Sequence, residues 1–200
     1  MDIKKILKDT AVLLVITLVS GLLLGAAYEV TNPIITARKE EEKAASYRGV
    51  FAEAANFESR EDLLEQSASV VSGAGINAEI TDVMAALDAS GSVLGYAMSI
   101  SVSGSQGEIV IAYGYGVDGT SMGIDILTSS ETSGLGSKAS EPEFKDQFAG
   151  KAVDSFSVVK SAAASDAEIS AISGATITSN AVTSAVNAGI VFGRYCAENN

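Results

Sequence analysis

The chain has 200 residues, of which 47% are hydrophobic, so it is long enough for one domain with a sizeable core and a membrane segment. A net charge of −12, from 13 Lys and Arg against 25 Asp and Glu, argues against a nucleic-acid binder, which needs a clustered basic face. With no His and a single Cys, Cys196, the chain excludes a Ser-His-Asp triad, an imidazole metal site and an internal disulfide. We therefore expect no metal site and no catalytic side chain, and we expect any difficult chemistry to come from a cofactor.

The first predicted element is a membrane span. No residue from Thr10 to Tyr28 is charged, and a helix of this length reaches roughly 28 Å, close to the thickness of a bilayer core. A cleavable secretory signal is the alternative, because a basic start at residues 4–8 precedes the apolar run and small residues end it. The run is long for a signal peptide and continues into further helical sequence, which favours a retained anchor.

Between the span and the next change of pattern, the sequence predicts helix. Apolar residues recur with helical spacing from Pro33 to about Asn56, around a charged run at 38–43 that is typical of a solvated face. Residues 58–66 are predicted to continue this helix, and 67–75 have the composition of a connector.

Strand-like alternation begins at Ile76. We expect two antiparallel hairpins, 78–87 with 93–102 and 108–117 with 121–127. A short helix at 141–148, a strand at 155–160 and a closing helix at 177–196 follow. Strands followed by helices predict an α+β fold, with a single N-terminal transmembrane helix before an antiparallel-sheet domain that carries flanking helices.

These elements divide the chain into four predicted parts. They are a cytoplasmic N-terminus 1–9, a transmembrane helix 10–28, a juxtamembrane helical region and connector 29–75, and an extracytoplasmic domain 76–200. The orientation follows from the basic residues before the span, which lie closer to the bilayer than those after it.

One motif, Ser173-Gly174-Ala175-Thr176-Ile177-Thr178, runs directly into the closing helix. Unpaired N–H groups and the positive end of the dipole favour a phosphate at a helix start, and Thr178 offers a hydroxyl to which a phosphate-linked cofactor can be joined. The alternative is that these Ser and Thr residues are ordinary N-caps.

A second motif, Glu131-Thr132-Ser133-Gly134-Leu135-Gly136, lies about forty residues upstream. Its two glycines allow the backbone to approach a flat ligand, and Leu135 offers that ligand an apolar face. The alternative is a surface turn after a strand.

The two motifs, in this order behind an anchor, resemble one family. Four further segments carry the same resemblance: Thr31–Ile34, Ala112–Thr120, Gly123–Leu127 and Phe144–Lys151. The chain is similar to the G subunit of the ion-translocating Rnf electron-transport complex, and also to the C subunit of the sodium-translocating NADH:quinone reductase.

The resemblance implies that FMN is bound covalently, through its phosphate, to Thr178, and that a dedicated flavin transferase installs it. It also implies that the rest of both motifs contacts the cofactor. Those residues are Ser173, Gly174, Ala175 and Thr176 in one motif, and Glu131, Thr132, Gly134, Leu135 and Gly136 in the other. The sequence departs from the family pattern at Ser170, where Asp is usual, and at Ser133, where Pro is usual.

The implied function is electron transfer by a single-pass subunit of the plasma (inner) membrane. The assembled complex couples electron flow between ferredoxin and NAD⁺ to Na⁺ or H⁺ transport, with iron–sulfur and multi-span membrane subunits as partners. The predicted span has no charged residue to mark an ion route, so pumping is expected in the partners. Two alternatives are an anchored FMN domain of a different reductase or electron-export chain, and a non-redox surface binding module.

Overall fold

The computed structural model describes residues 3–199, with side chains from Lys8 onward. The chain forms two compact units, with the boundary in the sequence between Glu42 and Lys43. Helix α1 (Ile3–Val50) accounts for the described part of the first unit and ends within the second. Within the described residues, α1 is the one helix that is long and apolar enough to cross a membrane by length and composition, and its most apolar window is not buried in the protein.

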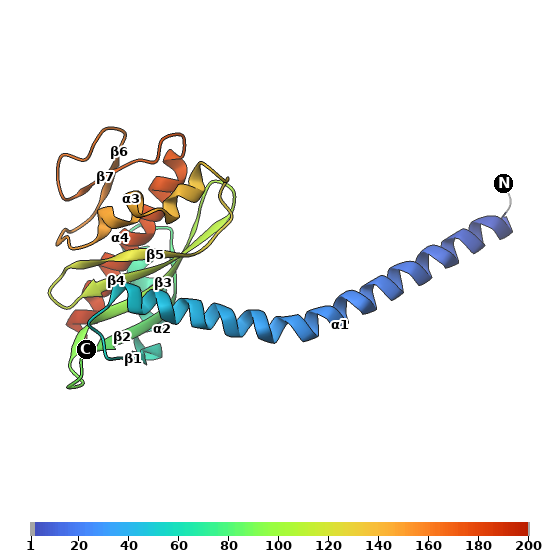
Figure 1. Ribbon diagram of the computed structural model, residues 1–200, viewed down its shortest axis with the longest axis horizontal. Coiled ribbons are helices and arrows are strands. Elements are labelled where there is room, and N and C mark those ends of the chain that lie inside the picture. The colour runs from blue at the N-terminus through green and yellow to red at the C-terminus, as the bar shows by residue number, and fades with distance from the viewer. Residues whose placement is uncertain (1–2, 200) are drawn as a thin grey trace. The chain divides into compact units, whose positions relative to one another are not determined.

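The second unit is built on a five-stranded antiparallel sheet (Figure 1). The strands are β1 (Asn56–Ser59), β2 (Glu79–Leu87), β3 (Val93–Ser103), β4 (Glu108–Gly116) and β5 (Ser121–Ser129), and each pairs with the next in chain order. Both predicted hairpins are present, β2 with β3 and β4 with β5. A separate parallel pair consists of β6 (Ser157–Val159) and β7 (Glu168–Ser170).

Five helical segments accompany the sheet. They are α2 (Glu61–Gly73), η1 (Gly136–Ser140), α3 (Pro142–Lys145), η2 (Asp146–Phe148) and α4 (Thr176–Glu198). The long helix α4 packs across β3 and β4. Together with the sheet these helices confirm the predicted α+β class.

Alternation along the strands sends side chains to two different cores. On one face Met98 and Tyr113, which are paired across β3 and β4, pack in the cluster that includes α4. Gly193 lets α4 come close to that face, because a Cβ there would lie 2.5 Å from Cδ1 of Tyr115. On the other face Phe51, just after α1, packs against small strand residues such as Ala97. The central strands β3 and β4 are therefore buried on both faces.

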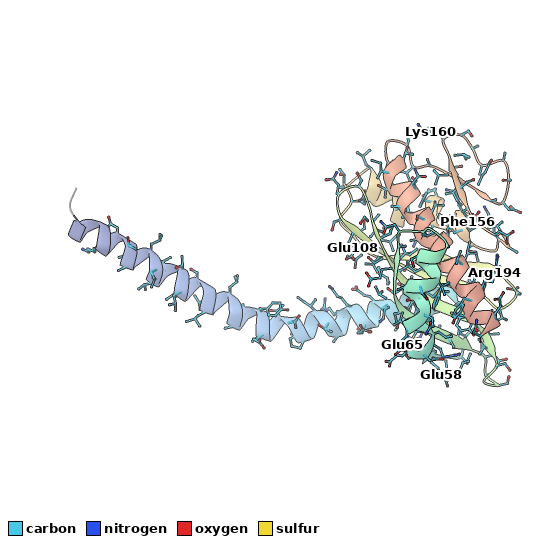
Figure 2. The ribbon with its side chains drawn as sticks, turned by 180° about the vertical axis from the view of Figure 1, so that it is seen from behind. Glu58, Glu65, Glu108, Phe156, Lys160 and Arg194 are labelled. Carbon is cyan, nitrogen blue, oxygen red and sulfur yellow. The ribbon has the colours of Figure 1, made fainter. Side chains whose placement is uncertain are left out.

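Charged side chains lie on the outside of this unit. Glu58, Glu65, Glu108, Lys160 and Arg194 are exposed there (Figure 2). With 25 acidic residues in the chain, such a surface favours solubility.

The region between the predicted span and the sheet differs from the prediction made for it. Helix α1 ends at Val50 rather than near residue 56, and residues 56–59 form the edge strand β1. Three of the four residues of β1 are exposed, so it lacks the apolar alternation by which a strand is recognised. The predicted connector at 67–75 is largely the second half of α2, whose buried Leu63, Ser67 and Val71 recur every four residues. The compact unit thus begins at Lys43 and includes residues predicted to be juxtamembrane.

Candidate functional site

The two sequence motifs meet in space and line one pocket of about 370 Å³. The pocket lies between the turn that joins β3 to β4, the segment after β5, and the start of α4. Its lining residues are Ser105, Gln106, Glu131, Thr132, Leu135, Gly136, Gly174, Ala175, Thr176, Ile177 and Thr178. Eight of the ten residues predicted to contact a cofactor are therefore together.

Thr178 is the third residue of α4, and the residue is only 1% exposed. Its Oγ1 donates a hydrogen bond of 2.5 Å to Oε2 of Glu131, 47 positions earlier in the chain. The N-cap of α4 is Ala175, which has no side chain able to cap the helix. The hydroxyl of Thr178 is thus directed to a carboxylate across the pocket, and the N-cap alternative does not describe it.

The turn before α4 is fixed by the hydroxyl of Ser179, a residue just outside the Ser173–Thr178 motif. Ser179 Oγ accepts a hydrogen bond from the N–H of Ile172 and donates one to the carbonyl of Ala175, each at 3.0 Å. Ser179 is fully buried. Its hydroxyl therefore holds the motif turn against the first turn of the helix.

The start of α4 also offers free backbone donors. Within residues 3–199 the structure gives no hydrogen-bond acceptor to the N–H groups of Thr176, Ile177 and Thr178, and the first paired N–H is that of Ser179, 3.0 Å from the carbonyl of Ala175. All three residues line the pocket. These donors and the positive end of the helix dipole favour an anionic group beside Thr178.

Glu131 holds the pocket together from the opposite side. Its Oε1 accepts hydrogen bonds from the N–H groups of Ser105 at 2.8 Å and Gln106 at 2.9 Å, while Oε2 accepts from Thr178. Burial opposes ionisation of this carboxyl, but the hydrogen bonds from Thr178 and from the two N–H groups outweigh it, so the pKa of Glu131 is lowered. Glu131 is therefore a carboxylate at neutral pH.

The glycines of both motifs make close approaches possible. A Cβ at Gly136 would lie 2.8 Å from Thr178 Oγ1 and 2.5 Å from Glu131 Oε2. Gly174 has φ +77° and approaches Leu135, whose Cδ2 would lie 3.2 Å from an added Cβ. Leu135 and Ile177 remain 44% and 64% exposed, so the pocket has apolar residues at its open side.

Two predicted site residues, Gly134 and Ser173, do not line this pocket. Gly134 supports the loop, since it has φ +76° and its N–H donates to Ser137 Oγ at 2.9 Å. Ser173 lines a neighbouring cavity of about 300 Å³, together with Ser170. Ser170 Oγ accepts a hydrogen bond from the N–H of Ala163 at 2.9 Å, so this hydroxyl serves a loop contact.

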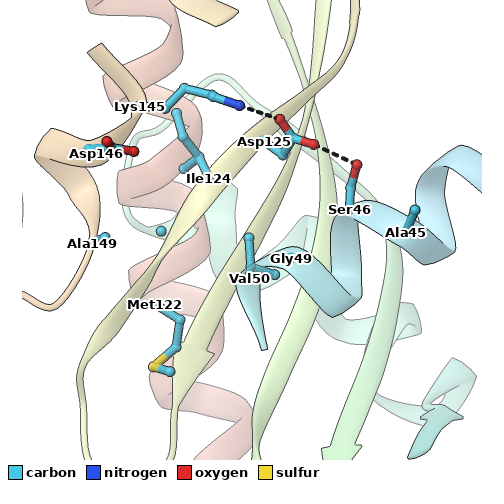
Figure 3. Close-up of a pocket in the computed structure, with 11 residues that line it drawn as sticks. Ala45, Ser46, Gly49, Val50, Met122, Ile124, Asp125, Lys145, Asp146 and Ala149 are labelled. Atoms are coloured by element: carbon cyan, nitrogen blue, oxygen red, sulfur yellow. Dashed lines mark hydrogen bonds and ion pairs between the residues drawn. The ribbon is translucent and has the colours of Figure 1, made fainter. Parts of the chain in front are cut away.

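A second pocket, of about 440 Å³, contains none of the predicted site residues. It lies between the end of α1, β5 and α3 (Figure 3). Lys145 Nζ and Ser46 Oγ each donate to Asp125, both at 2.7 Å. Burial raises the pKa of Asp125, but these two bonds more than compensate and the pKa is lowered overall. The charges of Asp125 and Lys145 thus offset each other, and their contacts join three elements of the fold.

Comparison with known proteins identifies the domain that contains this pocket. Residues 104–191, which include both motifs and the β3–β4 turn, match the family model of the FMN-binding domain. The chain is 37% identical over 194 residues to the G subunit of the Na⁺-translocating ferredoxin:NAD⁺ oxidoreductase complex of Acetobacterium woodii, a match that covers 94% of this chain and 92% of the relative.

A second relative and a solved structure show the family of the chain and its fold, respectively. It is 30% identical over 193 residues to the G subunit of the ion-translocating oxidoreductase complex of Methanosarcina acetivorans, covering 94% of this chain and 95% of that one. Its fold is similar to the crystal structure of Shewanella oneidensis NqrC, with a TM-score of 0.50 and 21% identity over 59% of each chain. The chain belongs to the family of G subunits of ion-translocating ferredoxin:NAD⁺ oxidoreductase, or Rnf, complexes.

Proposed function

We propose that this chain is the membrane-anchored electron-transfer subunit of an Rnf-type complex, and that it carries FMN joined through its phosphate to Thr178. The proposal rests above all on one observation: the hydroxyl of Thr178 lies in a pocket beside three unpaired N–H groups of α4. The match of residues 104–191 to the FMN-binding domain supplies the identity of the cofactor.

The residues of the pocket fit both ends of FMN. A phosphodiester keeps one negative charge, and the N–H groups of Thr176, Ile177 and Thr178 suit that charge without an Arg or Lys. The exposed side chains of Leu135 and Ile177 suit an apolar ring. FMN supplies the capacity to accept and donate electrons, which no side chain of this chain provides. The protein holds the phosphate, lines the ring and brings the cofactor near its partners.

The anchor and its orientation are part of the same proposal. Residues 1–9 are cytoplasmic, residues 10–28 cross the inner membrane, and the sheet domain is extracytoplasmic. Support comes from the apolar window of α1 and from the basic residues that precede it. The partners are the iron–sulfur and multi-span subunits of the complex, and a flavin transferase performs the maturation. Transport of Na⁺ or H⁺ belongs to those partners, because the segment 10–28 has no charged residue.

The attachment is tested by removing the acceptor oxygen. The full chain is coexpressed with a flavin transferase and measured by intact mass and by flavin fluorescence of the denatured protein on a gel. We expect the wild type to gain the mass of FMN less one water, and Thr178→Ala to gain nothing. Thr178→Ser retains a hydroxyl and is expected to keep part of the flavin.

Thr128→Ala is the matched control, since Thr128 lies in β5 and does not line the pocket. It is expected to be flavinylated like the wild type. A flavin adduct of unchanged yield on Thr178→Ala would contradict the assignment.

A further inference from the structure

The hydrogen atom that must leave Thr178 when an ester forms is the one that Glu131 accepts in this structure. We propose that Glu131 is a catalytic residue in the attachment of FMN, where it orients Oγ1 of Thr178 and takes its proton as that oxygen attacks phosphorus. This inference rests on the proposed function. It assigns to the chain itself a part of the chemistry of its own modification.

The reaction balances if the donor is a flavin nucleotide whose phosphate is part of an anhydride, such as FAD. The bond from Thr178 Oγ1 to phosphorus forms, and the bond from phosphorus to the bridging oxygen of the leaving nucleoside phosphate breaks. The proton passes from Thr178 to Glu131 and then to the leaving phosphate or to water. No atom is oxidised or reduced.

Glu131 is held in the position that this role requires. Two backbone N–H groups, from Ser105 and Gln106, bind Oε1 and leave Oε2 to face Thr178. In the part of the chain that the structure describes, Glu131 is the only hydrogen-bond partner of the Thr178 side chain. The chain has no His that could serve instead.

The charges around Thr178 favour the same sequence of events. A carboxylate beside the acceptor oxygen repels an incoming phosphate, but it becomes neutral when it takes the hydroxyl proton, so the repulsion falls as the new bond forms. The lowered pKa of Glu131 keeps the group unprotonated, and able to accept a proton, before the reaction. The unpaired N–H groups of Ile177 and Thr178 can then receive charge that develops on the phosphoryl oxygens. Phosphoryl transfer in general depends on such positioning and on charge stabilisation, and in protein kinases an Asp accepts the proton of the attacking hydroxyl.

The test uses the purified full chain without flavin, purified flavin transferase and FAD, with incorporation followed by intact mass. Glu131→Gln keeps the shape of the side chain and an oxygen for the N–H groups of Ser105 and Gln106, but it cannot take the proton. We expect kcat for incorporation to fall at least about 100-fold, with the KM for the acceptor chain changed by less than about 3-fold. Thermal unfolding and circular dichroism of the variant establish that it is folded.

Glu108→Gln is the matched control. Glu108 Oε1 accepts a hydrogen bond of 2.5 Å from the Ser101 hydroxyl in the same sheet, and it does not line the pocket (Figure 2). Its incorporation rate is expected to equal that of the wild type.

The outcomes separate the two proposals. If the wild type gains no flavin, the attachment itself is refuted. Suppose instead that the wild type gains flavin and that Glu131→Gln is folded. If this variant has the same kcat as the wild type, or differs only by a higher KM, as expected for the loss of a docking contact, the catalytic role of Glu131 is refuted and the attachment stands. Should Glu131→Gln fail to fold, Glu131→Ala with added formate decides: recovery of incorporation supports proton acceptance, and no recovery overturns it.

Discussion

Gly136→Ala tests whether the pocket depends on the close approach of three residues. An added Cβ would lie 2.5 Å from Glu131 Oε2, 2.8 Å from Glu131 Cβ and 2.8 Å from Thr178 Oγ1. The carboxylate oxygen is the far end of a flexible side chain and can rotate away, but Cβ of Glu131 is fixed to the backbone. To reach the ordinary carbon–carbon separation, Glu131 must retreat by about 1 Å, which breaks its contact with Thr178.

Overpacking of this kind destabilises a protein by about 1–3 kcal/mol. For a protein of this size each kcal/mol lowers the melting temperature by about 2–4 °C, so the melting temperature of Gly136→Ala should fall by about 2–12 °C. Flavin incorporation should fall as well, because both Glu131 and the acceptor oxygen are displaced.

The assay is thermal unfolding of the full chain in detergent, followed by circular dichroism, beside the incorporation assay. Gly73→Ala is the control, because Gly73 ends α2 and an added methyl there has no atom within 4 Å. It is expected to leave the melting temperature unchanged or slightly raised, since Ala favours helix over Gly. If Gly136→Ala unfolds and accepts flavin like the wild type, the packing of the pocket differs from the one described.

Two further predictions concern titratable groups. Cys196 is fully buried, and burial raises its pKa to about 12. At pH 8 the native protein should therefore not react with a thiol reagent, whereas the denatured protein should react at one site. Rapid labelling of the folded protein would contradict the burial of Cys196 in α4. Since the folded-state pKa of Glu131 is lowered, its charge stabilises the fold fully above a pH of about 4.5 and this contribution is lost as the pH falls through the lower folded-state value. The free energy of unfolding by urea should therefore be greater for wild type than for Glu131→Gln at pH 6, and the difference should shrink toward pH 4 and below; a difference that stays constant would show that the charge of Glu131 is not what stabilises the contact.

Local pattern was enough to predict the two hairpins of the sheet and the closing helix. The hairpins β2–β3 and β4–β5 join neighbours through short turns, so alternation and turn residues carry most of the information about their pairing. Edge strand β1 and strand β7 were not predicted, because their local pattern carries too little information. Each has three or four residues, and β7 pairs with β6 across a loop, so neither has enough length for a period to be visible.

The sequence predicted the two motifs of the site, but not the contact between them. Glycine spacing and a threonine at the start of a helix were enough to suggest a ligand-binding role for each segment, because those features are local. The hydrogen bond from Thr178 to Glu131 joins residues 47 positions apart and depends on where α4 crosses the sheet. Ser105 and Gln106, whose N–H groups bind Glu131, belong to a third segment. In the sequence, only the glycines on either side of them indicate a turn there. Which of their backbone groups face Glu131 is a property of tertiary packing.

The pocket makes opposing demands on a non-covalent flavin. Electron exchange with a partner requires that part of the ring stay accessible, and the exposed Leu135 and Ile177 at the open side of the pocket are consistent with such access. An accessible ring buries less apolar surface, however, and affinity falls with the area that is removed from water. Three N–H groups favour a phosphate but do not hold it permanently, because on dissociation the phosphate and the N–H groups form hydrogen bonds with water instead. The proposed ester at Thr178 separates these demands: retention depends on one covalent bond at the buried end of the site, which leaves the exposed end free to serve exchange with partners.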